Sequence, residues 1–162
     1  MDDRALIEAA RGGDREALEA FIERQQGRVL RFGMKMCRDP EDARDVAQET
    51  LLAAARGIAG FREAASPSTW LFTIARSFCI KKRRRSKFAP ASVLPLDGEE
   101  RRAALEVPDG GRGPEQVLEN RRLAAALDTA IAALEPKYRE VLVLRDVEGL
   151  KAAEVAAATG LG

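Results

Sequence analysis

The sequence predicts an all-α protein of two small helical domains joined by a flexible linker. Ala (29 of 162 residues) and Leu (17) far outnumber Val and Ile together (15), a composition that favours helix over sheet. Apolar residues recur at helical spacing between Asp-Pro, Ser-Pro and Gly-Gly punctuation. From Phe88 to Gly113 that spacing fails and Pro and Gly interrupt a polar stretch, which indicates a linker.

Four helices are expected in the first domain, residues 1–88. Their approximate ranges are 5–10, 14–37, 39–59 and 66–87. Asp39-Pro40 and Ser66-Pro67 are strong start signals, because a capping side chain precedes a proline at the first helical position. Trp70, Leu71, Ile74, Ala75 and Phe78 recur at helical spacing and are expected to form the buried stripe of the fourth helix.

The linker, residues 89–113, is expected to hold at most one helical turn around 101–105. The second domain, residues 114–162, is expected to contain helices at about 114–134, 136–147 and 151–158. Gly160 falls four residues after Ala156, a spacing that suits the tight turn of a helix-turn-helix.

Composition excludes several classes of function. The chain has no His and two Cys distant in sequence, so zinc sites and His-based catalysis are not expected, and no cofactor is expected. Two isolated cysteines fit a reducing compartment better than a disulfide framework. Asp2 and Asp3 follow Met1 and no apolar run approaches 18 residues, so neither a signal peptide nor membrane insertion is expected.

The net charge of +1 hides an uneven distribution of basic and acidic residues along the chain. Residues 61–90 carry +7, whereas the flanking segments together carry −6. Most of the excess lies in one block: Lys81, Lys82, Arg83, Arg84, Arg85 and Lys87. Such a block is either a solvated patch or a surface that binds nucleic-acid phosphates through counterion release.

An acidic face is expected on the third helix. Asp42, Asp45 and Glu49 stand at i, i+3 and i+7 with Gln48 beside them, so all four share one face. Nothing in an isolated fold needs this repulsive spacing. The face is either merely solvated or a docking surface for arginines of a partner.

Small and hydroxyl residues surround Trp70 just before the basic block. An aromatic and polar cluster beside a cationic helix suits the recognition of unstacked bases in a single strand. Core packing of Trp70 is at least as good an interpretation.

Three stretches together resemble a known family. They are Asp39-Pro40-Glu41-Asp42-Ala43-Arg44-Asp45-Val46-Ala47-Gln48-Glu49-Thr50; Ser68-Thr69-Trp70-Leu71-Phe72-Thr73-Ile74-Ala75-Arg76; and Leu134-Glu135-Pro136-Lys137-Tyr138-Arg139-Glu140-Val141-Leu142, followed by Val147-Glu148-Gly149-Leu150. In this order and spacing they resemble the extracytoplasmic-function (ECF) sigma factors of bacterial RNA polymerase. The resemblance covers about 6–85 and 114–161, everything but the linker.

The resemblance implies a cytoplasmic, non-enzymatic initiation factor, often of a stress response. It places core polymerase docking, on the clamp helices of the largest subunit, at Asp42, Asp45, Gln48 and Glu49. It places melting and reading of the minus-ten promoter element at Ser66, Ser68, Thr69, Trp70, Arg76 and Ser77, and phosphate contact at Lys81, Lys82, Arg83, Arg84, Arg85 and Lys87. The second domain normally reads the minus-thirty-five element, and an anti-sigma factor, membrane-associated or zinc-containing, is the usual inhibitor.

Three departures from the family pattern matter. Ser77 stands where Asn is common, and Lys151 stands where Ser or Thr usually caps the next helix. The chain ends at the turn of the helix-turn-helix, so we expect a truncated protein that lacks its recognition helix. A rival interpretation is a sigma-like mimic that sequesters an anti-sigma factor without binding DNA, although a mimic has no reason to keep the basic block. A third interpretation, a helical metal-dependent enzyme, is a remote one, because such chemistry needs a His/Asp cluster and the sequence has none.

Overall fold

The computed structural model describes residues 1–88 and 113–161, with side chains described for all of these except 86–88. Within these ranges every regular element is a helix, in agreement with the expected all-α class. We call residues 1–88 the first half and 113–161 the second half. The helical turn expected at 101–105 lies outside the described residues, as does the side chain of Lys87.

The first half contains the four expected helices and a short 3₁₀ turn. They are α1 (Asp3–Arg11), α2 (Arg15–Met36), α3 (Pro40–Gly57), η1 (Ile58–Gly60) and α4 (Pro67–Phe88). The predicted start signals are confirmed: the Asp39 carboxylate accepts the Glu41 N–H at 2.8 Å, and the Ser66 hydroxyl accepts the Thr69 N–H at 3.1 Å.

The second half contains α6 (Pro114–Ala133), α7 (Pro136–Leu142), the π-helix η2 (Val143–Val147) and α8 (Ala152–Thr159). The single helix expected at 136–147 therefore widens into a π turn, in which the Glu148 N–H donates to the Val143 carbonyl at 2.9 Å. The Arg139 guanidinium caps α6 by donating to three carbonyls near its end, those of Ile131, Ala132 and Leu134.

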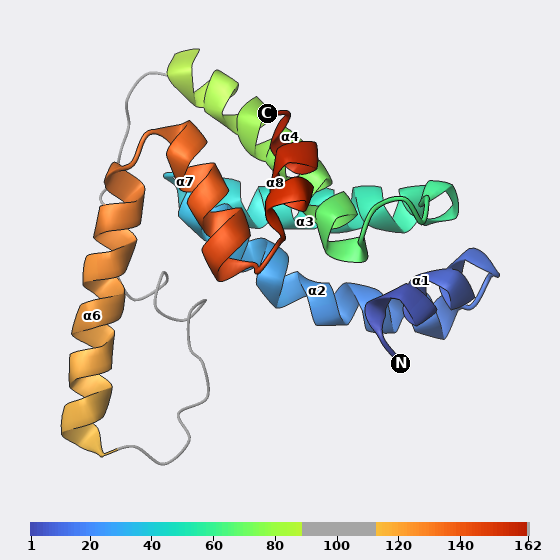
Figure 1. The fold of residues 1–162 in the computed structure, drawn as a ribbon, viewed down its shortest axis with the longest axis horizontal. Helices are drawn as coiled ribbons and strands as arrows, with labels where there is room; N and C mark the ends of the chain where they lie inside the picture. Colours follow the sequence, from blue (N-terminus) through green and yellow to red (C-terminus); the bar gives the residue numbers. More distant parts are fainter. Residues whose placement is uncertain (89–112, 162) are drawn as a thin grey trace.

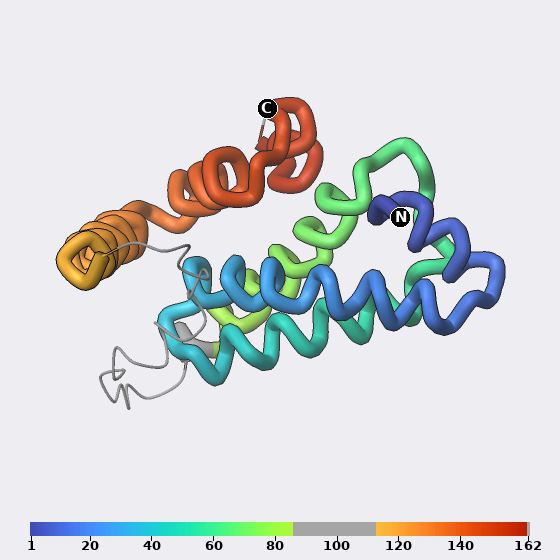
Figure 2. Tube along the Cα trace, turned by 90° about the horizontal axis from the view of Figure 1, so that it is seen from below, coloured from blue at the N-terminus to red at the C-terminus, as the bar shows by residue number. Residues whose placement is uncertain are grey.

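The helices form layers around α4 (Figures 1 and 2). Helices α2 and α3 run antiparallel beneath it, and α7 and α8 lie over its other side, while α6 stands at the edge of the molecule. None of the helices within 1–88 and 113–161 is long and apolar enough to cross a bilayer.

One hydrophobic core extends through both halves. Its buried members come from α2, α3 and α4 in the first half, and from η2, α8 and the turn between them in the second. Those of the second half are Val143, Leu144, Leu150, Val155 and Ala158. Helix α6 buries no residue completely, and Leu118, Leu123 and Leu127 on it remain exposed. The second half therefore completes its core on the first.

A smaller core joins α1 to the start of α4. Ile7, Phe21 and Phe61 are buried in it, and Trp70 packs against both this core and the larger one. The rings of Phe61 and Trp70 meet edge to face with centroids 5.2 Å apart. Trp70 thus has the packing role that the sequence left open.

Helices α2 and α3 approach most closely at Gly33. A Cβ built there would lie 3.0 Å from the Ala43 carbonyl oxygen and 3.3 Å from the Ala43 Cα, both of which are backbone atoms. The backbone of α3 cannot move aside without disturbing the core beneath it. Glycine is therefore required at this position.

We expect Gly33→Ala to lower the free energy of unfolding by about 1–3 kcal/mol, because the added methyl group overpacks the contact between α2 and α3. Gly27→Ala is the matched control on the same helix, since its Cβ would meet only the flexible Arg31 side chain, at 3.3 Å. Gly27→Ala should stabilise the chain by about 0.5–1 kcal/mol through helix propensity. Urea denaturation measures both, and equal effects of the two variants would contradict the close contact.

Candidate nucleic-acid interface

The acidic face of α3 is exposed in part and paired in part. Asp45, Gln48 and Glu49 are exposed, and Asp42 is half-buried. The Lys82 ammonium on α4 lies 2.8 Å from Asp45 Oδ2 and 3.7 Å from Asp42 Oδ1. The hydrogen bond to Asp45 raises the pKa of Lys82 above its ordinary value. The expectation that the fold has no use for this face was wrong for Asp42 and Asp45, because both hold α4.

The basic block of α4 is divided between solvent and protein. Lys81, Arg84 and Arg85 are exposed, whereas Lys82 and Arg83 are half-buried. Lys82 is held by α3, and the Nε atom of Arg83 is buried. Of the five cations of the block whose side chains are described, three are therefore available to a polyanion, and two are turned towards the first half itself.

The hydroxyl groups at the start of α4 contact each other and the second half. Ser66 and Thr69 are hydrogen-bonded through their hydroxyls at 2.8 Å, and Thr69 is buried. The Thr69 hydroxyl also donates to the Glu154 carboxylate at 3.1 Å. Hydrogen bonding by Ser66, by the Lys151 backbone N–H and by Thr69 lowers the pKa of Glu154. Glu154 thus supplies the cap of α8 that the Lys151 side chain, which has no acceptor, cannot.

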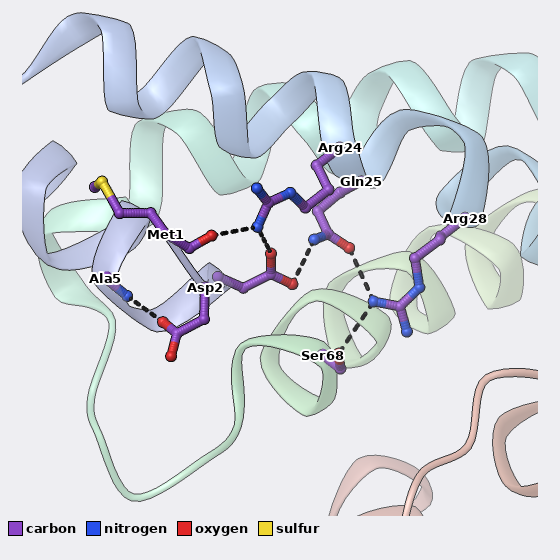
Figure 3. A network of polar contacts seen from close by, with 8 residues as sticks. Met1, Asp2, Ala5, Arg24, Gln25, Arg28 and Ser68 are labelled. Carbon is purple, nitrogen blue, oxygen red and sulfur yellow. Dashed lines mark hydrogen bonds and ion pairs between the residues drawn. The ribbon is translucent and has the colours of Figure 1, made fainter.

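A network of polar side chains places Ser68 (Figure 3). Gln25, fully buried on α2, donates to Asp3 of α1 at 2.7 Å and accepts from Arg28 at 3.1 Å. Arg28 in turn donates to the Ser68 hydroxyl at 3.3 Å, and its guanidinium lies 5.3 Å from the centroid of the Phe72 ring. The network links α1, α2 and the first turn of α4.

Further along α4, Arg76 forms an ion pair with Glu140 of α7, a carboxylate that is almost fully buried. Ser77 is exposed and donates its hydroxyl to the Ile74 carbonyl at 2.7 Å. Trp70 lies half-buried between the two cores. Of the six residues expected to read bases, only Ser77 is thus exposed in this arrangement.

Acidic side chains of the second half make the contacts that cover α4 and the adjoining part of α2. Besides Glu140 and Glu154, Glu148 pairs with Arg28 at 3.3 Å and Asp128 pairs with Lys35 at 2.9 Å. Burial raises the pKa of Glu148 despite the opposing charge of Arg28. Two α4 residues expected to meet DNA, Thr69 and Arg76, are therefore engaged by carboxylates, whose charged oxygens resemble those of phosphate.

Sequence reasoning missed these partners. Gln25 carried a usable signal, because Phe21, Gln25, Val29 and Phe32 lie on one helical stripe and a single polar residue among three apolar ones indicates a buried hydrogen bond. No comparable signal in the sequence marks the three glutamates, Glu140, Glu148 and Glu154, because their partners lie 64 to 120 positions away.

In the part of the chain that the structure describes, no group of three or more potential metal ligands occurs. What the geometry offers is an acidic helix face and a basic helix end on one small bundle.

Comparison with known proteins assigns the family. Residues 21–88 match sigma-70 region 2 and residues 124–162 match sigma-70 region 4. The chain is 34% identical to the ECF RNA polymerase sigma factor SigC of Mycobacterium tuberculosis, over 98% of this chain and 82% of the relative. It is 29% identical to SigE of Mycolicibacterium smegmatis, where it spans 56% of the relative's length, and 27% identical to the RNA polymerase sigma-H factor of Pseudomonas aeruginosa, where it spans 80%.

A solved structure shares the fold. CnrH, determined in complex with the cytosolic domain of CnrY, superimposes with a TM-score of 0.67 at 22% identity, over 99% of this chain and 84% of CnrH. With both sigma regions matched in order, and with SigC similar over nearly the whole chain, this protein belongs to the ECF sigma factors of RNA polymerase.

Proposed function

We propose that the chain directs transcription initiation by docking on core RNA polymerase through α3 and binding promoter DNA through α4. The observation that carries the proposal is the placement of an exposed acidic face and an exposed basic end on neighbouring helices of one sigma region-two bundle. The chain supplies binding energy and specificity in the cytoplasm, and the polymerase supplies the catalysis.

Docking uses the Glu49 carboxylate and the Gln48 amide, which the fold leaves available to a partner. Glu49 and Gln48 are exposed, so the Glu49 carboxylate can accept a bidentate pair of hydrogen bonds from an arginine of the clamp helices, and the Gln48 carbonyl oxygen can accept a further one. Asp42 and Asp45 contribute to the same field, but each already attracts Lys82. Gln48 and Glu49 are therefore the better test of docking.

DNA binding falls to Lys81, Arg84 and Arg85 for phosphates, with Lys87 beyond them on the same helix. Unstacked bases would lie along a row of residues from the turn before α4 to its middle: Ser66, Ser68, Thr69, Arg76 and Ser77. Trp70 belongs here only as the packing residue that sets the position of this turn.

In this arrangement DNA must displace the second half from α4. Thr69 and Arg76 are engaged by Glu154 and Glu140, so a strand cannot contact them until those carboxylates leave. Phosphates compete for the same groups, because they present the same charged oxygens. A partner that draws the second half away therefore promotes DNA binding.

The protein named CnrY in the related complex is an example of a partner that binds a sigma-like fold. We infer that an inhibitory protein, an anti-sigma factor, also binds this chain. The mimic interpretation gains nothing from the relatives described above, which are named as sigma factors.

Run-off transcription with core polymerase and a genomic promoter library tests the function as a whole. Defined transcripts that depend on the added chain support it. Their absence, in a preparation that binds polymerase, would favour the mimic.

The double variant Gln48→Ala/Glu49→Ala should bind core polymerase about tenfold or more weakly, since charge-assisted hydrogen bonds at an interface are worth over 1 kcal/mol each. Its melting temperature should be unchanged, because both side chains are exposed. Glu19→Ala, on an exposed part of α2, is the control for loss of an acidic side chain. Affinity for core polymerase is measured by fluorescence anisotropy. An unchanged affinity of the double variant would contradict docking through α3.

The triple variant Lys81→Ala/Arg84→Ala/Arg85→Ala should weaken binding to a labelled single strand. It should also reduce the slope of log K against log salt by about 2, because each phosphate contact contributes about 0.7 for single strands. Lys82→Ala is the matched control, since Lys82 is held by Asp45 and should leave the slope nearly unchanged. Equal effects of the two variants on the slope would show that the division of the basic block is wrong.

The double variant Glu140→Gln/Glu154→Gln should bind the same single strand more tightly than the parent chain, by about three- to tenfold. The reason is that Arg76 and Thr69 lose the carboxylates that cover them, and the open arrangement becomes more populated. Glu135→Gln, which pairs only with Lys137 in its own half, makes the same kind of charge change and should have little effect. Titration by anisotropy measures all three, and equal or weaker binding by the double variant would contradict the displacement.

A further inference from the structure

The two cysteines, distant in sequence, lie against each other in the first half. Cys37 directly follows α2 and is half-buried, and Cys79 lies on α4 and is buried. Their Sγ atoms are 4.0 Å apart although the residues are separated by 42 positions. A disulfide requires about 2.05 Å, so the sulfurs need to approach by about 2 Å.

We propose that Cys37 and Cys79 are a redox modification site, at which a hydroperoxide oxidises Cys37 and Cys79 then closes a reversible disulfide. Nothing in the sigma activity proposed above uses either thiol. The site is therefore additional to that activity, and it stands or falls independently of it.

Cys37 is the residue that reacts with the oxidant. It is the more accessible of the two, and its thiol is hydrogen-bonded to the Cys79 sulfur, at 4.0 Å. That hydrogen bond lowers the pKa of Cys37, with further help from Arg83 and Lys82, against the opposing effects of burial and Asp42. The same hydrogen bond, together with burial, raises the pKa of Cys79. Of the two thiols, Cys37 therefore forms the thiolate, which is the nucleophile, more readily.

Arg83 gives the pair a cation. Its Nε atom is buried and makes no hydrogen bond within the described residues, and its charge favours the thiolate form of both cysteines. A buried donor without an acceptor costs free energy, and that cost falls when a negative sulfur forms nearby.

The chemistry balances with hydrogen peroxide as the oxidant. The Cys37 thiolate attacks one peroxide oxygen, the O–O bond breaks, and Cys37 becomes a sulfenic acid while hydroxide leaves and is protonated. The Cys79 sulfur then attacks the Cys37 sulfur, its proton joins the departing hydroxide, and the S–S bond forms. Two thiols lose two electrons and two protons, and one peroxide becomes two waters.

The bond would tie together the elements that carry the two proposed surfaces. Cys37 lies between Gly33, where α2 meets α3, and Asp39, which caps α3. Cys79 lies three residues before Lys82, which Asp45 holds. The disulfide therefore fastens α4 to the corner between α2 and α3 and constrains the unfolded chain, so the oxidised chain should melt at a higher temperature.

The test treats the reduced full chain with increasing hydrogen peroxide and then alkylates it after denaturation. The expected result is joint loss of both thiols, a mass lower by about 2 Da, and a single cross-linked peptide pair that dithiothreitol releases. The product should remain monomeric on a non-reducing gel. Loss of the Cys37 thiol while Cys79 stays alkylatable, or cross-linking only between chains, would overturn the proposal.

Variants separate the roles of the two cysteines. Cys79→Ser should stop at the sulfenic acid or proceed to sulfinic acid at Cys37, and Cys37→Ser should leave Cys79 at least about tenfold less reactive than Cys37 in the parent, because it is buried. Arg83→Gln should slow the first step several-fold, with Arg84→Gln, exposed on the same helix, as the control. Equal rates for these two variants would remove Arg83 from the site. The peptide map of the parent chain decides the disulfide itself, whatever the variants do.

Discussion

Packing on both sides of α4 is the constraint on which the rest of the structure depends. One side of the helix packs against α2 and α3, with the Phe72 ring beside Phe32 of α2 at 5.3 Å between centroids, and the other receives the second half. Every surface of interest is placed by this arrangement. The acidic face lies on α3, which supports α4. The basic block is the free end of α4, and the thiol pair connects α4 to the end of α2.

The shared core explains why carboxylates of the second half meet both α2 and α4. The second half buries its apolar residues against the first, which brings the polar residues of η2, α7 and α8 to the rim of that contact. The rim of the first half is basic, with Arg28, Lys35 and Arg76, so acidic residues opposite them are favoured. The covering of the expected DNA-binding face follows from charge complementarity around an apolar centre.

Local structure could be predicted from the sequence because its causes are local. Asp39 and Ser66 cap the helices that they were expected to cap, since a cap depends on residues within one turn. The apolar stripe of α4 was likewise correct, because helical periodicity decides it. The π turn at Val143–Val147 could not be foreseen, as it adds a single residue to a helix that otherwise has ordinary composition.

The site could be predicted only where one helix determines it. The acidic face and the basic block each follow from spacing along a single helix, whereas the pairing of Lys82 with Asp45 requires two helices at a known separation. The same holds for Arg76 with Glu140 and for the two cysteines, which are remote in sequence. Sequence therefore indicated which residues carry charge, and the fold determined which of those charges are available.

The continuous core also governs how the chain unfolds and how it changes shape. A second half that moved away from α4 would expose Val143, Leu144, Leu150 and Val155 to water, an area that a small helical unit cannot cover by itself. In the chain free of any partner, the two halves should consequently melt together as one cooperative unit, with matching hydrogen-exchange protection in α4 and α8. An extended form is therefore favoured by a partner that covers the same apolar residues, so the shape of this factor depends on what it is bound to.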